Sequence, residues 1–112
     1  MTARRIVFSD AALADILEQS DWYADKVGRK LAKRWEDGVT STLLRIAKAP
    51  GIGSLCEFSA DELRGMRRVS VVGFPRHLIF YQAREHEIFI LRTLHGARDL
   101  ESLFSERGSF KS

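Results

Sequence analysis

Two short apolar runs separated by a polar segment constrain the fold of this chain most. Leu78–Tyr81 and Ile88–Leu91 are rich in aromatic and β-branched residues, and Gln82–Glu87 between them is polar. Runs of this length and composition predict strands rather than helices. The short separator is typical of a β-hairpin. We therefore expect antiparallel strands at 76–82 and 87–95.

The segments around this hairpin extend it into a small α+β domain. An apolar stretch at 65–72 precedes a glycine–proline turn, so 65–95 should form an antiparallel meander. Beyond the last strand, Gly96 interrupts the strand pattern, and the residues that follow predict a short helix at 98–104.

The N-terminal half predicts a strand followed by two helices. Arg4–Phe8 has a strand pattern, and Ser9 suits the N-cap of a following helix. Apolar residues then recur at helical spacing in two stretches separated by Gly28. The first stripe comprises Leu13, Ile16, Leu17, Tyr23, Ala24 and Val27, and the second comprises Leu31, Trp35, Val39, Leu43 and Ile46. Helices joined by so short a break should pack antiparallel, with Trp35 in the core against the sheet.

Length and composition indicate one domain of an ordinary globular protein. The chain has 112 residues, of which 45% are hydrophobic and 29% are charged. Cys56 is the only cysteine, so no intramolecular disulfide can form and a reducing compartment is expected. No apolar run approaches the roughly 20 residues that a membrane-spanning helix needs. We expect a cytoplasmic protein with no membrane partner.

The positive charge is concentrated in the second half of the chain. Residues 1–63 carry nine basic and ten acidic side chains, whereas residues 64–112 carry nine basic and only five acidic ones. A set of arginines lies on or beside the predicted meander, including Arg64, Arg67, Arg68, Arg76, Arg92 and Arg98. With His95 and Tyr81, such a set can bind phosphates and stabilise a pentacovalent phosphate. Exposed arginine on an edge strand equally protects against aggregation.

The sequence contains few signals for a metal or a cofactor. His77, His86 and His95 lie on or near neighbouring strands, but no third ligand follows with the spacing of a metal site. There is no glycine-rich phosphate loop and no nucleophile-elbow serine, and Cys56 has no acid–base partner nearby. We therefore expect neither a metal nor a cofactor.

The two central strands are apolar on both faces. Successive side chains in a strand point to opposite sides of the sheet, and the predicted helices can cover only one side. The other side must be covered by the C-terminal segment, by a partner or by another copy of the chain, and we expect a partner chain to share this role.

The predicted layout strand–helix–helix–strand–strand–strand–helix resembles the RelE/ParE superfamily of bacterial toxins from type II toxin–antitoxin pairs. The resemblance spans nearly the whole chain, from Ile6-Val7-Phe8-Ser9 onwards. Its most specific segment is the string I-L-R-T-L-H-G-A-R-D-L at 90–100, which is similar to the C-terminal signature of the ParE branch.

The resemblance implies a toxin that inhibits DNA gyrase and is neutralised by a cognate antitoxin, with no cofactor. The implied target-binding residues are Arg92, His95, Arg98 and Asp99, although Asp99 equally suits the cap of the C-terminal helix. The implied antitoxin-binding residues are Leu78, Phe80, Tyr81, Phe89, Leu91, Leu100 and Leu103. The resemblance also allows a higher-order toxin–antitoxin assembly.

Two alternatives remain open within the same fold. RelE-like members are metal-independent ribonucleases that cut mRNA on the ribosome, and in this chain Arg68, Arg76, Arg92 and His95 would be the catalytic candidates. The absence of any tyrosine after Tyr81 weakens that reading. The second alternative is a basic domain that has lost toxicity and serves only as a binding partner.

Overall fold

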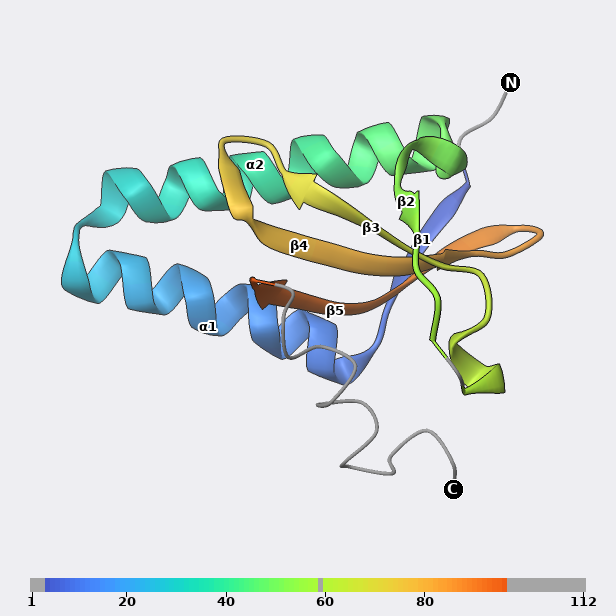
Figure 1. Ribbon diagram of the computed structural model, residues 1–112. Coiled ribbons are helices and arrows are strands. Elements are labelled where there is room, and N and C mark those ends of the chain that lie inside the picture. Colours follow the sequence, from blue (N-terminus) through green and yellow to red (C-terminus); the bar gives the residue numbers. More distant parts are fainter. Residues whose placement is uncertain (1–3, 59, 97–112) are drawn as a thin grey trace.

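In the computed structural model, which describes residues 4–58 and 60–96, a helical hairpin lies against one side of a five-stranded sheet (Figure 1). The elements in chain order are β1 (Arg5–Phe8), α1 (Asp10–Lys26), α2 (Arg29–Lys48), a 3₁₀ turn (Pro50–Ile52), β2 (Ser54–Leu55), a second 3₁₀ turn (Asp61–Leu63), β3 (Met66–Val71), β4 (Phe74–Ala83) and β5 (Glu87–His95). This confirms the predicted α+β class, the N-terminal strand, the helical hairpin and the meander. The helix predicted at 98–104 lies outside the described residues. Neither α1 nor α2 has the length and apolarity of a membrane span.

The strand order in the sheet is β1-β5-β4-β3-β2. β3, β4 and β5 pair antiparallel, whereas β1 pairs parallel with β5, with Ile6 opposite Ile88 and Phe8 opposite Ile90. The register of β4 against β5 shifts at Phe80, which is opposite Arg92, while Tyr81 is opposite Ile90. β1 ends level with Ile90, so among the described strands none pairs with this edge of β5 from Leu91 to His95.

A single serine joins the first helix to that edge. Ser9 accepts a hydrogen bond at its Oγ from the amide of Ala12 (2.9 Å), which caps α1 as predicted. The same hydroxyl donates to the carbonyl oxygen of Leu91 (2.7 Å). The start of α1 is therefore fixed beside β5 where β1 ends.

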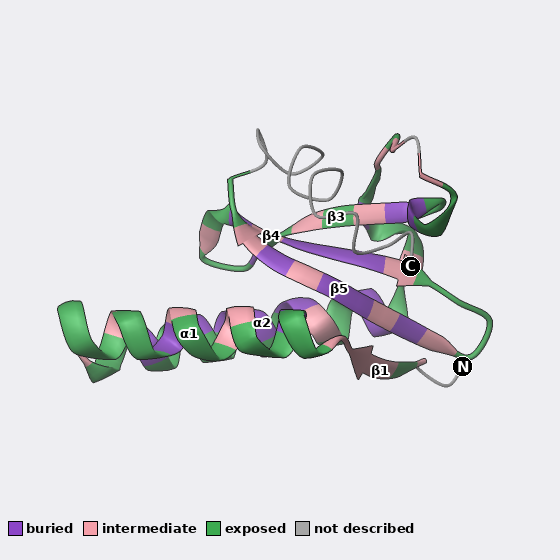
Figure 2. Ribbon diagram, turned by 90° about the horizontal axis from the view of Figure 1, so that it is seen from below, coloured by how far each residue is buried: buried purple, intermediate pink, exposed green. Residues whose placement is uncertain are grey.

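The main core lies between the helices and the sheet, and both helices occupy the same side of the strands (Figure 2). Trp35 is fully buried in this core, as predicted, and its Nε1 donates to the carbonyl oxygen of Ile16 at 3.1 Å. Tyr81 is also fully buried here. Its hydroxyl donates to Pro50 O (2.8 Å) and accepts from the Gly53 amide (2.9 Å), so it ties the end of α2 to the sheet.

The apolar stripe predicted for the first helix is only partly correct. Leu13, Leu17 and Val27 are 45, 56 and 64% exposed, whereas Ala12 and Ser20 are buried. α1 packs against both α2 and β5. Small side chains allow that close approach, and the Ser20 hydroxyl bonds to the Glu36 carboxylate of α2.

The other side of the sheet carries a second apolar cluster. Phe80 and Leu91 are buried there with Leu63 and Met66, and residues of the 56–60 segment pack against them. The segment between α2 and β3 contains both 3₁₀ turns and β2. Its residues supply part of the cover that we expected from the C-terminal segment or a partner. We call this side of the sheet the outer face.

Candidate functional site

The end of β5 is held against α1 by a two-point ion pair. Arg92 donates from Nε to Asp15 Oδ2 (2.8 Å) and from a terminal nitrogen to Oδ1 (2.9 Å), and the Thr93 amide donates to Oδ2 (3.0 Å). Both side chains are largely buried, at 17 and 13% exposure. The hydrogen bond to Asp15 raises the pKa of Arg92, so the pair stays charged. Arg92 therefore has a structural partner in this chain.

Two histidines lie close together near the end of β5, on the side of the sheet that the helices cover, which we call the helical side. His77 on β4 is opposite His95 on β5, and their ring centroids are 4.7 Å apart. His77 is buried among Tyr23, Trp35 and Phe74. Burial, and then the neighbouring His95, lower the pKa of His77 to about 4, so its imidazole is neutral at pH 7. His95 is exposed at the strand end.

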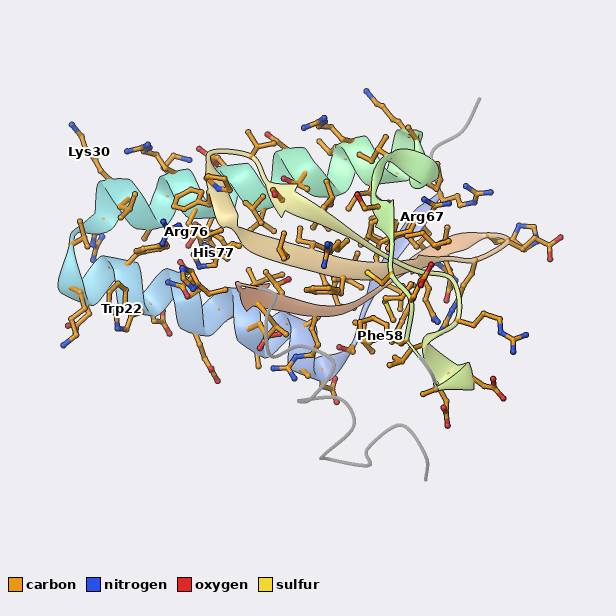
Figure 3. All side chains as sticks on the ribbon, in the orientation of Figure 1. Trp22, Lys30, Phe58, Arg67, Arg76 and His77 are labelled. Atoms are coloured by element: carbon orange, nitrogen blue, oxygen red, sulfur yellow. The ribbon has the colours of Figure 1, made fainter. Side chains whose placement is uncertain are left out.

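The remaining predicted arginines occupy different surfaces, and two of them, Arg67 and Arg76, are labelled in Figure 3. Arg68 is opposite Phe80 and exposed on the outer face, and strand alternation puts the exposed Arg76 on that side too. Arg67 points the other way and donates to Gly53 O at 2.7 Å. Arg64 pairs with Asp61 at 3.0 Å on the surface. Arg98 and Asp99 lie outside the described residues.

The predicted antitoxin-binding residues are divided between the two sides of the sheet. Leu78, Phe80, Phe89 and Leu91 belong to the outer-face cluster, where Leu78 and Phe89 are half-buried. Tyr81 belongs to the opposite core and has no exposed surface. Leu100 and Leu103 lie outside the described residues.

A groove between α1 and the end of β5 was not predicted from the sequence. Its walls and floor are formed by Asp15, Glu18, Gln19, Trp22, His77, Thr93 and His95, and we call it the α1–β5 groove. The first four residues have the spacing i, i+3, i+4, i+7, which places them on one helical face. That spacing was visible in the sequence, but its position opposite the free edge of β5 was not.

Within residues 4–58 and 60–96, no three histidine, cysteine, aspartate or glutamate side chains are placed to hold a metal ion. Cys56 is a free thiol, and burial raises its pKa, which keeps it protonated at pH 7.

Fold and surfaces together define a small sheet-and-hairpin domain in which Arg68 and Arg76 are exposed on the outer face and His95 is exposed at the end of β5. Comparison with protein families gives the class a name. The family model of the ParE toxin of type II toxin–antitoxin systems, parDE, matches residues 6–100. The chain belongs to this family, which confirms the resemblance to the ParE branch.

A solved structure shares the fold. The chain is similar to a chain described as the chromosomal ParDE TA system from P. aeruginosa, with a TM-score of 0.67 and 16% sequence identity. The match covers 85% of this chain and 98% of that one. None of the curated proteins compared with the chain matches it.

Proposed function

We propose that this ParE-family toxin inhibits DNA gyrase in the cytoplasm by binding to it, and that a cognate antitoxin neutralises it. Membership of the ParE toxin family supports the toxin part of the proposal. The structural neighbour described as a ParDE TA system supports an antitoxin partner. The gyrase target follows from the resemblance of the 90–100 segment to the ParE signature.

The observation that favours binding over catalysis is the separation of the four ribonuclease candidates. Arg68 and Arg76 lie on the outer face, whereas His95 lies on the helical side beside His77. Arg92 donates from Nε and from one terminal nitrogen to the carboxylate of Asp15. A scissile phosphate needs its acid, base and cationic groups within hydrogen-bond reach of one centre. These four side chains do not surround one, which supports a recognition surface.

In this proposal the gyrase surface begins at the exposed His95 and continues through Arg98 and Asp99. The Arg92–Asp15 pair lies just before it and acts by holding the end of β5, so we no longer assign Arg92 a direct contact. Arginine's planar guanidinium at position 98 suits a carboxylate or phosphate partner.

The antitoxin surface in this proposal is the outer face. Leu78 and Phe89 offer half-buried apolar surface, and the Arg84 guanidinium stacks on the Phe89 ring at 4.3 Å from its centroid. Arg68 and Arg76 add positive charge. An acidic antitoxin segment that folds on contact would match this mixture. Tyr81 is excluded from the surface because it is buried on the helical side, and Phe80 and Leu91 are buried beneath the outer face.

The gyrase proposal is tested with two assays on the same purified toxin. It should block supercoiling by gyrase, and it should leave mRNA intact on programmed ribosomes. Ribosome-dependent cleavage with normal supercoiling would instead support the ribonuclease reading, and inactivity in both assays would support the non-toxic module.

The antitoxin surface is tested by charge reversal. Arg76→Glu should weaken antitoxin binding, whereas Arg29→Glu on α2, which is also exposed, should not. If both variants weaken antitoxin binding equally, or if neither weakens it, the antitoxin binds somewhere other than the outer face.

A further inference from the structure

Two buried polar atoms in the α1–β5 groove have no hydrogen-bond partner among residues 4–58 and 60–96. They are His77 Nε2 and Thr93 Oγ1, and their residues are only 6 and 5% exposed. Both residues line the groove and project from neighbouring strands on the helical side. Buried polar atoms are nearly always paired, because an unpaired one loses its hydrogen bonds to water without compensation. The coincidence of two such atoms at one groove indicates that something else supplies their partners.

The exposed wall of the groove has the character of a cation site. Trp22 is 53% exposed on α1, and Figure 3 shows it at the same end of the molecule as His77. Glu18 is exposed beside it. Arg92 pairs with Asp15 and also interacts electrostatically with Glu18, so one guanidinium faces two carboxylates. His77 is neutral at pH 7, and these groups together leave an excess of negative charge at the groove.

We propose that the α1–β5 groove binds the guanidinium group of an arginine side chain presented by a partner protein. Glu18, the Thr93 hydroxyl and the His77 imidazole offer acceptors in different directions, and the Trp22 face offers a cation–π surface. This goes beyond the proposed function, because it assumes no contact with gyrase and assigns no role to the outer face.

The chemistry of the lining distinguishes this ligand from others. The carboxylate of Glu18 would repel a phosphate, so a nucleotide fits poorly. A lysine ammonium has three donors on one atom, whereas a guanidinium has five donors in a plane that can stack on an indole and reach several acceptors at once. Access requires the exposed His95 ring to turn aside, and exposed side chains change rotamer within nanoseconds.

The direct test is an NMR titration of the isotope-labelled full chain with N-acetyl-arginine amide. Matched titrations use N-acetyl-citrulline amide, its neutral isostere, and the lysine derivative. The arginine probe should bind in the millimolar range and shift the Trp22 indole N–H and the Thr93 amide. Binding several-fold tighter than that of both controls supports the proposal. Equal shifts with citrulline, or shifts outside the groove, would overturn it.

Variants separate binding from folding. Thr93→Val removes a hydroxyl that bonds to nothing in the described residues, so the thermal midpoint should stay or rise while the arginine probe binds more weakly. Trp22→Leu keeps apolar surface without a π face and should weaken binding about two- to fivefold. Glu18→Gln should weaken it as well.

Two control variants remove an exposed apolar side chain and an exposed carboxylate at positions outside the groove. Leu44→Ala removes an exposed apolar side chain from α2, and Glu57→Gln removes an exposed carboxylate outside the groove. Neither should alter affinity for the arginine probe. If Thr93→Val and Trp22→Leu bind as the parent does, or if the controls weaken binding equally, the proposal is wrong.

Discussion

Arg92 at the end of β5 donates two hydrogen bonds to the carboxylate of Asp15 on α1, at 2.8 and 2.9 Å, across 77 positions of sequence. The Thr93 amide joins the same carboxylate at 3.0 Å. β1 ends at Phe8, so Asp15 takes over a backbone donor that a longer β1 would have paired. One aspartate therefore both fixes the strand edge and neutralises the arginine.

Asp15→Ala should lower the free energy of unfolding by about 3 kcal/mol, because it leaves a largely buried guanidinium and a strand amide without their acceptor. Urea unfolding would measure it. The exposed pair Lys33–Asp37 provides the control, and Asp37→Ala should cost only about 0.5 kcal/mol.

A double-mutant cycle tests whether Arg92 is the partner that matters. Replacing Arg92 by methionine should make the Asp15→Ala change markedly less costly, with a coupling on the order of 1–3 kcal/mol. Additive losses in the cycle would show that Asp15 acts only through the Thr93 amide.

Gly38→Ala in the middle of α2 should destabilise the protein, although alanine favours helices over glycine by about 1 kcal/mol. A methyl group at this position would collide with the Val72 carbonyl oxygen and meet Val71 Cγ1 at 3.3 Å. Overpacking of this kind typically costs about 1–3 kcal/mol. Gly51→Ala, where nothing lies within 4 Å, is the matched control. A rise in stability for Gly38→Ala would show that α2 can move away from β3.

Local sequence patterns predicted the helices and strands of this fold better than they predicted how these elements pack against one another. The apolar runs gave β4 and β5 because strand composition is a local property. They could not give the parallel pairing of β1 with β5, which depends on residues about 80 positions apart. Leu13 and Leu17 fit a helical stripe, but the surfaces of α2 and β5 select Ala12 and Ser20 for close packing.

The candidate site was predictable only in part for the same reason. The sequence predicted His77 and His95 on neighbouring strands, and the register of β4 against β5 places them opposite each other. Asp15 avoids the apolar stripe in the sequence and so resembles a solvent-exposed residue. Its pairing with Arg92 depends on the tertiary packing of α1 beside the edge of β5, which a local sequence pattern does not contain.

Stability should fall as the pH decreases from about 6.5 to about 4, in part because of His77. Its folded pKa is about 4 and its ordinary value is 6.5, so between these values the unfolded chain binds a proton that the folded chain does not. Up to about 3 kcal/mol is lost across this window. Urea unfolding at several pH values would measure the slope, and NMR would follow the His77 imidazole. Protonation of folded His77 near pH 6 would contradict its burial.

Gyrase inhibition should depend on His95 and Arg98 in a graded way. In the proposed function each side chain contributes one polar contact to a recognition surface, and a hydrogen bond is worth about 1 kcal/mol. His95→Ala and Arg98→Ala should therefore each raise the inhibitory concentration about fivefold, and the double variant should show roughly the product. A general acid or base would instead contribute about 10²–10⁴-fold to a cleavage rate.

The measurement is the toxin concentration that halves supercoiling, with each variant's unfolding free energy recorded alongside it. His95 is exposed, so its replacement should leave stability nearly unchanged. Arg29→Ala removes an exposed arginine at the start of α2 and should not alter inhibition. Arg92→Ala should instead lose inhibition and stability together, because Arg92 holds the end of β5 through Asp15. Full inhibition by the His95 and Arg98 double variant would place the gyrase surface elsewhere on the toxin.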